Sequence, residues 1–213
     1  MTTINFTPWI GENYKTGINN KKTIILGEAH YLNDVENNNW NLPEKKPKFT
    51  KACISAQIGI DKGDGVWTHP FFTKIVSAIT GITSPNNDQK TEFWNSVIFM
   101  NYIQEFVDGG ARKRPTKSQW EQAVSYFQNI VMIHKPENIL VFGYDLWDHV
   151  SKTLKNTVIE KVKFSGKKRA TNSYFISDKE EYSFNVLPFY HPSSRFSPSQ
   201  WHVIYKEFTK ATL

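Results

Sequence analysis

Four continuously apolar runs, separated by segments of helical periodicity, constrain this 213-residue chain most strongly. The runs are "TIILG" at 23–27, "SVIFMNYI" at 96–103, "NILVFG" at 138–143 and "SFNVLPFY" at 183–190. Such runs are typical of parallel strands buried on both faces, and their alternation with helices favours an α/β fold. We therefore expect one domain over 1–213, with three α/β/α layers around a mostly parallel four-stranded central sheet.

Three helices have recognisable starts. Residues 118–135 show helical apolar spacing, and Ser118 with Glu121 indicates a capping box at the first turn. Pro70 and Pro198 are each expected in the first turn of a further helix, because proline tolerates that position. The helix that begins at Pro70 places Phe71 beside its apolar stripe rather than within it.

Two stretches lack a clear period. Residues 36–51 are rich in Asn and Lys and hold two prolines, so we expect a loop there. Residues 161–184 predict a hairpin insertion that turns at "SGKK". Pro188 cannot donate a hydrogen bond to a neighbouring strand, so the last strand is expected to end there or to lie at an edge.

Positive charge is clustered along the chain. Lysine and arginine total 26 against 20 acidic residues, and the excess gathers at 44–51, 111–117 and 161–169. Basic loops on a folded domain suit a polyanion such as nucleic acid, whereas a single lysine-rich run is as often plain solvated surface. Three runs together favour a phosphate-bearing partner.

Composition also removes several classes of protein. The single cysteine, Cys53, excludes an intrachain disulfide and a cysteine-ligated zinc or iron–sulfur site. The six histidines show no metal-type spacing. The first residues lack a basic start followed by an apolar run, so no signal peptide is expected, and no apolar segment reaches membrane-spanning length. We expect a monomeric cytoplasmic protein with no metal, no cofactor and no membrane partner.

Polar residues follow the expected strands where ligands gather in a parallel sheet, beyond the carboxyl ends. "GEAHY" follows the first run, "GYDLWDH" the third and "HPSSRF" the fourth, while Asn101 closes the second. Burying such polar side chains costs free energy, so their presence at strand ends indicates a functional site. We expect a binding pocket at this edge of the sheet.

These motifs, taken in order, resemble the uracil-DNA glycosylase superfamily. The series is Gly27-Glu28-Ala29, Pro70-Phe71, Asn101, Arg114-Pro115-Thr116 and His191-Pro192-Ser193. The pattern is most similar to the branch whose motifs read GE-small, PF, TN and HP, although that branch carries an iron–sulfur cluster. The resemblance spans roughly residues 23–210, and it depends on the order of short motifs at strand and helix ends.

The resemblance implies cleavage of the N-glycosidic bond of uracil or another modified base in DNA, single-stranded or duplex, after the base is extruded. His191 would stabilise the charge on the leaving base, and Glu28 would assist the water. Asn101 would read the base edge, and Phe71 would stack on its ring.

The remaining site residues follow from the same resemblance and from the basic runs. Gly27, Ala29 and Tyr31 would complete the base pocket. The side chains expected to contact the nucleic-acid backbone are Arg112, Lys113, Arg114, Ser193 and Arg195.

Two departures leave alternatives open. Ala29 stands where many members carry an Asp or Asn that activates water, so either Glu28 compensates or the chain is an inactive nucleic-acid-binding member. Arg195 replaces a Leu that wedges into the duplex, which favours a single-stranded, mismatched or otherwise unusual substrate. A serine hydrolase using Ser193 or Ser194 is a third interpretation, although no GxSxG elbow surrounds either serine.

The four residues assigned to catalysis, base reading and stacking also have purely structural interpretations. His191 before a proline can cap a turn, and Asn101 can satisfy local backbone groups. Phe71 can be ordinary core, and Glu28 can pair with a nearby lysine at the surface.

Overall fold

The computed structural model describes residues 5–60, 68–110, 113–153, 158–166, 169–177 and 182–211. It is an α/β fold whose strands are β1 (Trp9–Ile10), β2 (Thr23–Gly27), β3 (His30–Leu32), β4 (Val97–Asn101), β5 (Phe106–Asp108), β6 (Asn138–Phe142), β7 (Val158–Gly166), β8 (Arg169–Ser177) and β9 (Ser183–Phe189). The helices are α1 (Phe49–Gln57), α2 (Pro70–Thr80), α3 (Asn87–Asn95), α4 (Lys117–His134), α5 (Tyr144–Thr153) and α6 (Pro198–Ala211).

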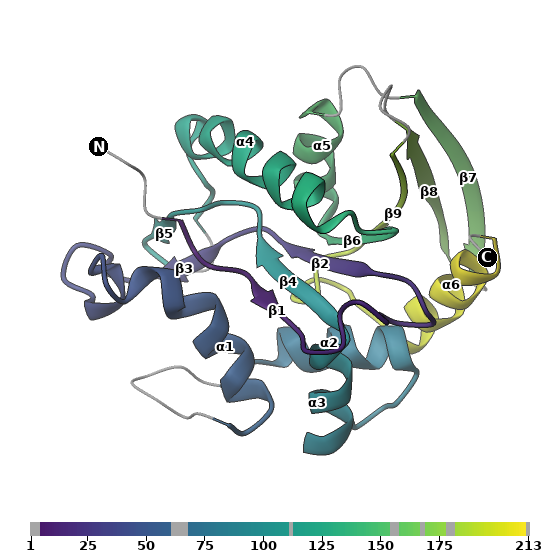
Figure 1. Cartoon of the computed structure of the whole chain (residues 1–213), viewed down its shortest axis with the longest axis horizontal. Coiled ribbons are helices and arrows are strands. Elements are labelled where there is room, and N and C mark those ends of the chain that lie inside the picture. The colour runs from purple at the N-terminus through teal and green to yellow at the C-terminus, as the bar shows by residue number, and fades with distance from the viewer. Residues whose placement is uncertain are drawn as a thin grey trace.

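The main sheet is mixed and runs in the order β1-β4-β2-β6-β9-β8-β7 (Figure 1). The four strands expected from the apolar runs are β4, β2, β6 and β9, and they pair parallel to one another. β1 adds antiparallel to β4, and β8 adds antiparallel to β9. The sheet is therefore larger and less uniformly parallel than expected. A small separate sheet pairs β3 with β5.

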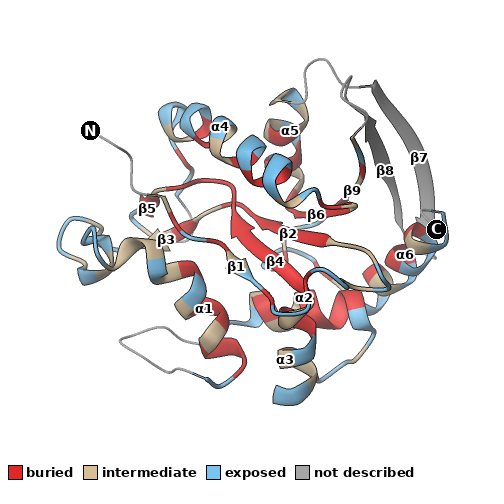
Figure 2. Ribbon diagram, in the orientation of Figure 1, coloured by how far each residue is buried: buried red, intermediate tan, exposed pale blue. Residues whose placement is uncertain are grey.

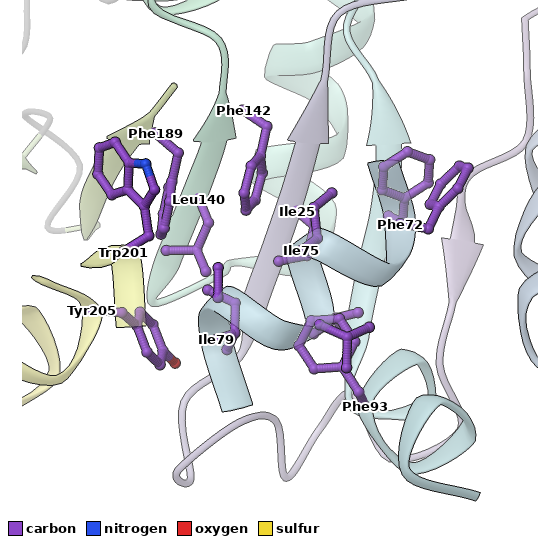
Figure 3. Packing of buried hydrophobic residues seen from close by; sticks show 14 of the residues in the cluster. Ile25, Phe72, Ile75, Ile79, Phe93, Leu140, Phe142, Phe189, Trp201 and Tyr205 are labelled. Atoms are coloured by element: carbon purple, nitrogen blue, oxygen red, sulfur yellow. The ribbon is translucent and has the colours of Figure 1, made fainter. Parts of the chain in front are cut away.

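Helices cover both faces of the main sheet, with α4 and α5 on one side and α1, α2, α3 and α6 on the other (Figure 1). Strand residues alternate between the two cores: Ile25 packs with Ile75 of α2, while Ile24 and Leu26 pack under α4 and α5. Figure 2 shows the resulting burial of β2, β4 and β6, and Figure 3 shows the core on the α2 and α6 side. Burying each such aliphatic side chain stabilises the fold by about 1.5–3 kcal/mol.

The helix starts agree with the sequence at two positions and differ at a third. α2 begins at Pro70 and α6 at Pro198, as expected. The capping box of α4 is formed by Thr116 and Gln119, whereas the pair expected from the sequence begins at Ser118. Thr116 has the extended backbone of an N-cap, and Ser118 already lies in the first turn.

Residues 36–51 are less irregular than expected. Two short 3-10 turns, Asn39–Asn41 and Lys46–Lys48, lie within the stretch, and α1 begins at Phe49. The side chain of Asn38 caps the first turn by accepting a hydrogen bond from the N–H of Trp40 at 2.9 Å. The sequence expectation of a plain loop was wrong here because short capped turns produce no apolar period.

The segment expected to form a hairpin contains β7 and β8, which pair antiparallel and extend the main sheet. The residues of its turn, 167–168, lie outside the described residues. Pro188 lies inside β9 opposite Val141, but the pairing of β9 with β8 stops at Val186. The missing N–H of Pro188 therefore interrupts no bond to β8, and this is why a proline is tolerated in a strand that is not at the edge.

Candidate functional site

The carboxyl ends of β2 and β4 lie side by side, and they bring Gly27 and Asn101 into direct register. A side chain at Gly27 would overlap the Asn101 side-chain oxygen, so the glycine leaves room for the Asn101 side chain in its present position. Asn101 is only 5% exposed. Among the described residues no hydrogen bond engages its side-chain amide, so the NH2 group can donate to a ligand and the carbonyl oxygen can accept from it.

Glu28 follows Gly27 and is held through one oxygen. The Tyr31 hydroxyl donates a hydrogen bond to Glu28 Oε1 at 2.6 Å, and Arg114 Nη1 lies 3.3 Å from the same atom. Arg114 Nη2 in turn contacts Asp145 Oδ2 at 2.9 Å. Burial, followed by the hydrogen bond and the charge of Glu28, raises the pKa of Tyr31, so its phenol stays protonated and donates.

His191 follows the end of β9 and lies against Phe71 from the start of α2. Their ring centroids are 5.3 Å apart with an interplanar angle of 38°. Lys74, one turn further along α2, donates from Nζ to the Pro192 carbonyl at 2.7 Å and ties the helix to the loop. Phe71 packs only partly into the core, and this leaves part of its ring available for stacking.

The backbone sets the protonation of His191. The N–H of Ser193 donates to His191 Nδ1 at 3.2 Å, so Nδ1 is an acceptor and the ring proton lies on Nε2. Burial is the main cause that lowers the pKa of His191, and the charges of Arg114, His69 and Lys74 lower it further. The imidazole is thus neutral near pH 7 and presents an N–H donor.

The other predicted site residues lie around these strand ends or outside the described chain. Ala29 and Tyr31 are partly buried against the core under α4 and α5. Ser193 and Arg195 are exposed in the loop after β9, and Lys113 is exposed before α4. Arg112 lies outside the described residues.

Two residues with no role in the sequence interpretation belong to this region. Asp145, in the first turn of α5, binds Arg114. His69 repeats the arrangement of His191: it precedes a proline, and its Nδ1 accepts the N–H of Phe71 at 3.1 Å. The signal for His69 is the repeated His-Pro pair, visible in the sequence. Asp145 lies in the "GYDLWDH" stretch after the third apolar run, but no local signal identifies its partner, which is 31 residues away.

A polar hollow of about 300 Å³ lies elsewhere, between α4 and the residues that precede β5. Its lining includes Gln104, Glu105, Gln119, Gln122 and Tyr126 and none of the predicted site residues. Several of its amides are already bonded within the protein, such as Gln104 to the Asn101 carbonyl at 2.7 Å. The hollow is therefore separate from the strand ends that carry the predicted site residues.

Comparisons with known proteins add no family assignment. A scan against models of known families finds no match, and a search of curated proteins finds no similar chain. The described side chains contain no group of three or more His, Cys, Asp or Glu placed to hold a metal ion. None of the helices described above has the length and apolar character needed to cross a membrane.

Proposed function

We propose that this chain is a uracil-DNA glycosylase-like domain that binds DNA and hydrolyses the N-glycosidic bond of uracil or another modified base. The proposal is supported by two pairs of motif residues, and by the charge of Arg114, which contacts Glu28 and lowers the pKa of His191. Asn101 lies in register with Gly27, Glu28 follows directly, and the ring of His191 lies 5.3 Å from that of Phe71. An amide, a carboxylate, an imidazole donor and a stacking ring are the groups such a reaction requires.

The reaction assigns a step to each group. An extruded base would stack on Phe71, with its edge on the Asn101 amide. The C1′–N bond breaks and its electron pair leaves with the base, where the His191 Nε2–H would donate to the ring carbonyl that gains charge. A water then adds its oxygen to C1′ and passes a proton to Glu28. A neutral imidazole suits this role because it donates one hydrogen bond from a fixed tautomer.

A second candidate, a binding domain that holds a base without cleaving it, has its own support. Ala29 offers no acid–base group, and the Glu28 carboxylate already accepts from Tyr31 and contacts Arg114. These contacts can serve to hold the side chain in place, without a part in proton transfer. A serine hydrolase has less support, because the Ser194 hydroxyl donates to the His191 carbonyl at 2.7 Å and not to a ring nitrogen.

Cleavage of a uracil-containing oligonucleotide, revealed by alkali as a strand break, separates the candidates. The glycosylase proposal expects breaks with the wild type that are lost in His191→Ala and Asn101→Ala. His134→Ala, at the end of α4 and outside the site, is the matched control and retains the wild-type rate. Tight, salt-sensitive binding without abasic product would favour the binding domain instead.

A further inference from the structure

Arg114 bridges two carboxylates from different elements. Glu28 follows β2, and Asp145 lies in the first turn of α5. The Arg114 guanidinium contacts Glu28 Oε1 at 3.3 Å through Nη1 and Asp145 Oδ2 at 2.9 Å through Nη2. Both terminal nitrogens are therefore turned toward carboxylates, although the sequence suggested a phosphate contact. A planar guanidinium fixed at two points holds its partners in a defined geometry.

The contacts on Glu28 are unequal between its two oxygens. Tyr31 and Arg114 both approach Oε1, whereas no hydrogen bond from a described residue reaches Oε2. The Glu28 side chain is 8% exposed and the Arg114 side chain 55% exposed. The carboxylate is therefore buried, and Arg114 lies between it and the solvent. A carboxylate held through one oxygen presents the other in a fixed direction.

We propose that Arg114, held in place by Asp145, is a positioning residue that orients Glu28 so that Oε2 faces the reacting water. The inference rests on the proposed glycosylase function. Oε2 takes the proton as the water oxygen bonds to C1′, and the C1′–N electron pair leaves with the base. Arg114 acts through Glu28 and contacts neither base nor sugar.

Asp145 separates this role from a phosphate contact. If Arg114 bound a DNA phosphate, the negative charge of Asp145 would compete with that phosphate, and Asp145→Asn would tighten DNA binding without slowing cleavage. If Arg114 positions Glu28, Asp145→Asn releases one end of the guanidinium and slows the chemical step. The two roles thus predict opposite results for one substitution.

The test measures single-turnover cleavage of a uracil-containing single-stranded oligonucleotide at saturating protein, together with its dissociation constant. We expect Asp145→Asn to slow cleavage about 10-fold, because small misplacements of a catalytic group carry large rate costs. The dissociation constant should stay within about twofold, and Arg114→Gln should slow cleavage further.

In a Glu28→Gln background, Asp145→Asn should have no additional effect. Glu207→Gln, which breaks the exposed Lys210–Glu207 pair, is the control.

A slower rate from Asp145→Asn that persists in the Glu28→Gln background would overturn the inference, as would a change in affinity alone. A readout independent of cleavage is the ¹⁵N-edited NMR spectrum of the arginine Nη groups. A guanidinium fixed at both ends rotates slowly and gives separate Nη signals, which Asp145→Asn and Glu28→Gln should abolish. Unchanged signals in Asp145→Asn would refute the bridge. Intact signals in a wild type that yields no abasic product would instead refute the glycosylase function and the catalytic role that rests on it.

Discussion

His30, the first residue of β3, and His191, in the loop after β9, have surroundings that differ in kind. His30 lies 4.9 Å from the ring of Phe6 and 4.8 Å from that of Phe49, and its Nε2 is 2.8 Å from Thr50 Oγ1. Burial lowers the pKa of His30 to about 3. His191 is only partly buried, and its ring contacts Phe71 and a backbone N–H.

The difference shows what makes an imidazole available for chemistry. Apolar rings and a hydroxyl surround His30, so it is a neutral, hydrogen-bonded part of the core between the N-terminal segment and α1. In His191 the Nδ1 atom accepts a hydrogen bond from the Ser193 N–H, whereas Nε2–H takes no part in that bond. The positive charges of Arg114 and Lys74 act on this ring. Partial exposure together with one fixed nitrogen, rather than position after a strand, distinguishes the candidate functional histidine.

The largest expected effect is on the cleavage rate, which should depend on His191 and not on His30. His191→Ala should lower the single-turnover cleavage rate about 10²–10³-fold, as loss of one donor to a developing negative charge does elsewhere. The unfolding midpoint should change little, because His191 is not part of either core. A His191→Ala variant that cleaves at the wild-type rate would remove the distinction between the two regions.

The opposite pattern is expected for His30. His30→Ala should lower the free energy of unfolding by about 2–4 kcal/mol, since it leaves a cavity and an unpaired Thr50 hydroxyl. Denaturant unfolding measures the loss, and the cleavage rate per folded molecule should stay near the wild-type value. A rate loss as large as that of His191→Ala would place His30 in the site.

A smaller effect concerns pH. Because the pKa of His191 is lowered from 6.5, the neutral ring persists below pH 6.5 and protonates only at more acid pH. Protonation adds a second donor opposite the Ser193 N–H and breaks that bond. The acid limb of the cleavage rate should therefore have its midpoint below pH 6.5, as a pH profile of the single-turnover rate would show. A midpoint above pH 6.5 would contradict a lowered pKa of His191.

The smallest expected effect tests the cations around His191. Lys74→Gln removes one of the charges that lower the pKa of His191, so the acid limb of the profile should move toward higher pH. Lys206→Gln, an exposed lysine on α6, should leave the limb in place. Equal profiles for Lys74→Gln and the wild type would mean that the charge of Lys74 does not lower the pKa of His191.

The central strands could be predicted from sequence because their residues are apolar without interruption. Ile24, Ile25 and Leu26 are all fully buried. A strand that is covered on both faces appears in the sequence as an uninterrupted apolar run, which can be recognised without knowing the neighbouring strands. The placement of Asn101 and Glu28 at one edge follows from parallel pairing. Short elements such as β3 and β5 were missed because three residues carry no period.

Contacts between distant residues could not be predicted in the same way. Arg114 belongs to a basic run that indicated phosphate binding, but its partners depend on where α5 begins relative to β2. The partial burial of Phe71 could be anticipated, since it lies beside the apolar stripe of α2. Its contact with His191 required the position of the loop after β9, which packing and Lys74 determine.

The most direct test is a crystal structure of the protein with a single-stranded oligonucleotide that carries 2′-fluoro-2′-deoxyuridine, whose glycosidic bond resists cleavage. We predict that the uracil lies on Phe71, with its edge on the Asn101 amide and a ring carbonyl within hydrogen-bond distance of His191 Nε2. A uracil bound elsewhere, with Asn101 and His191 both turned away from it, would contradict the account.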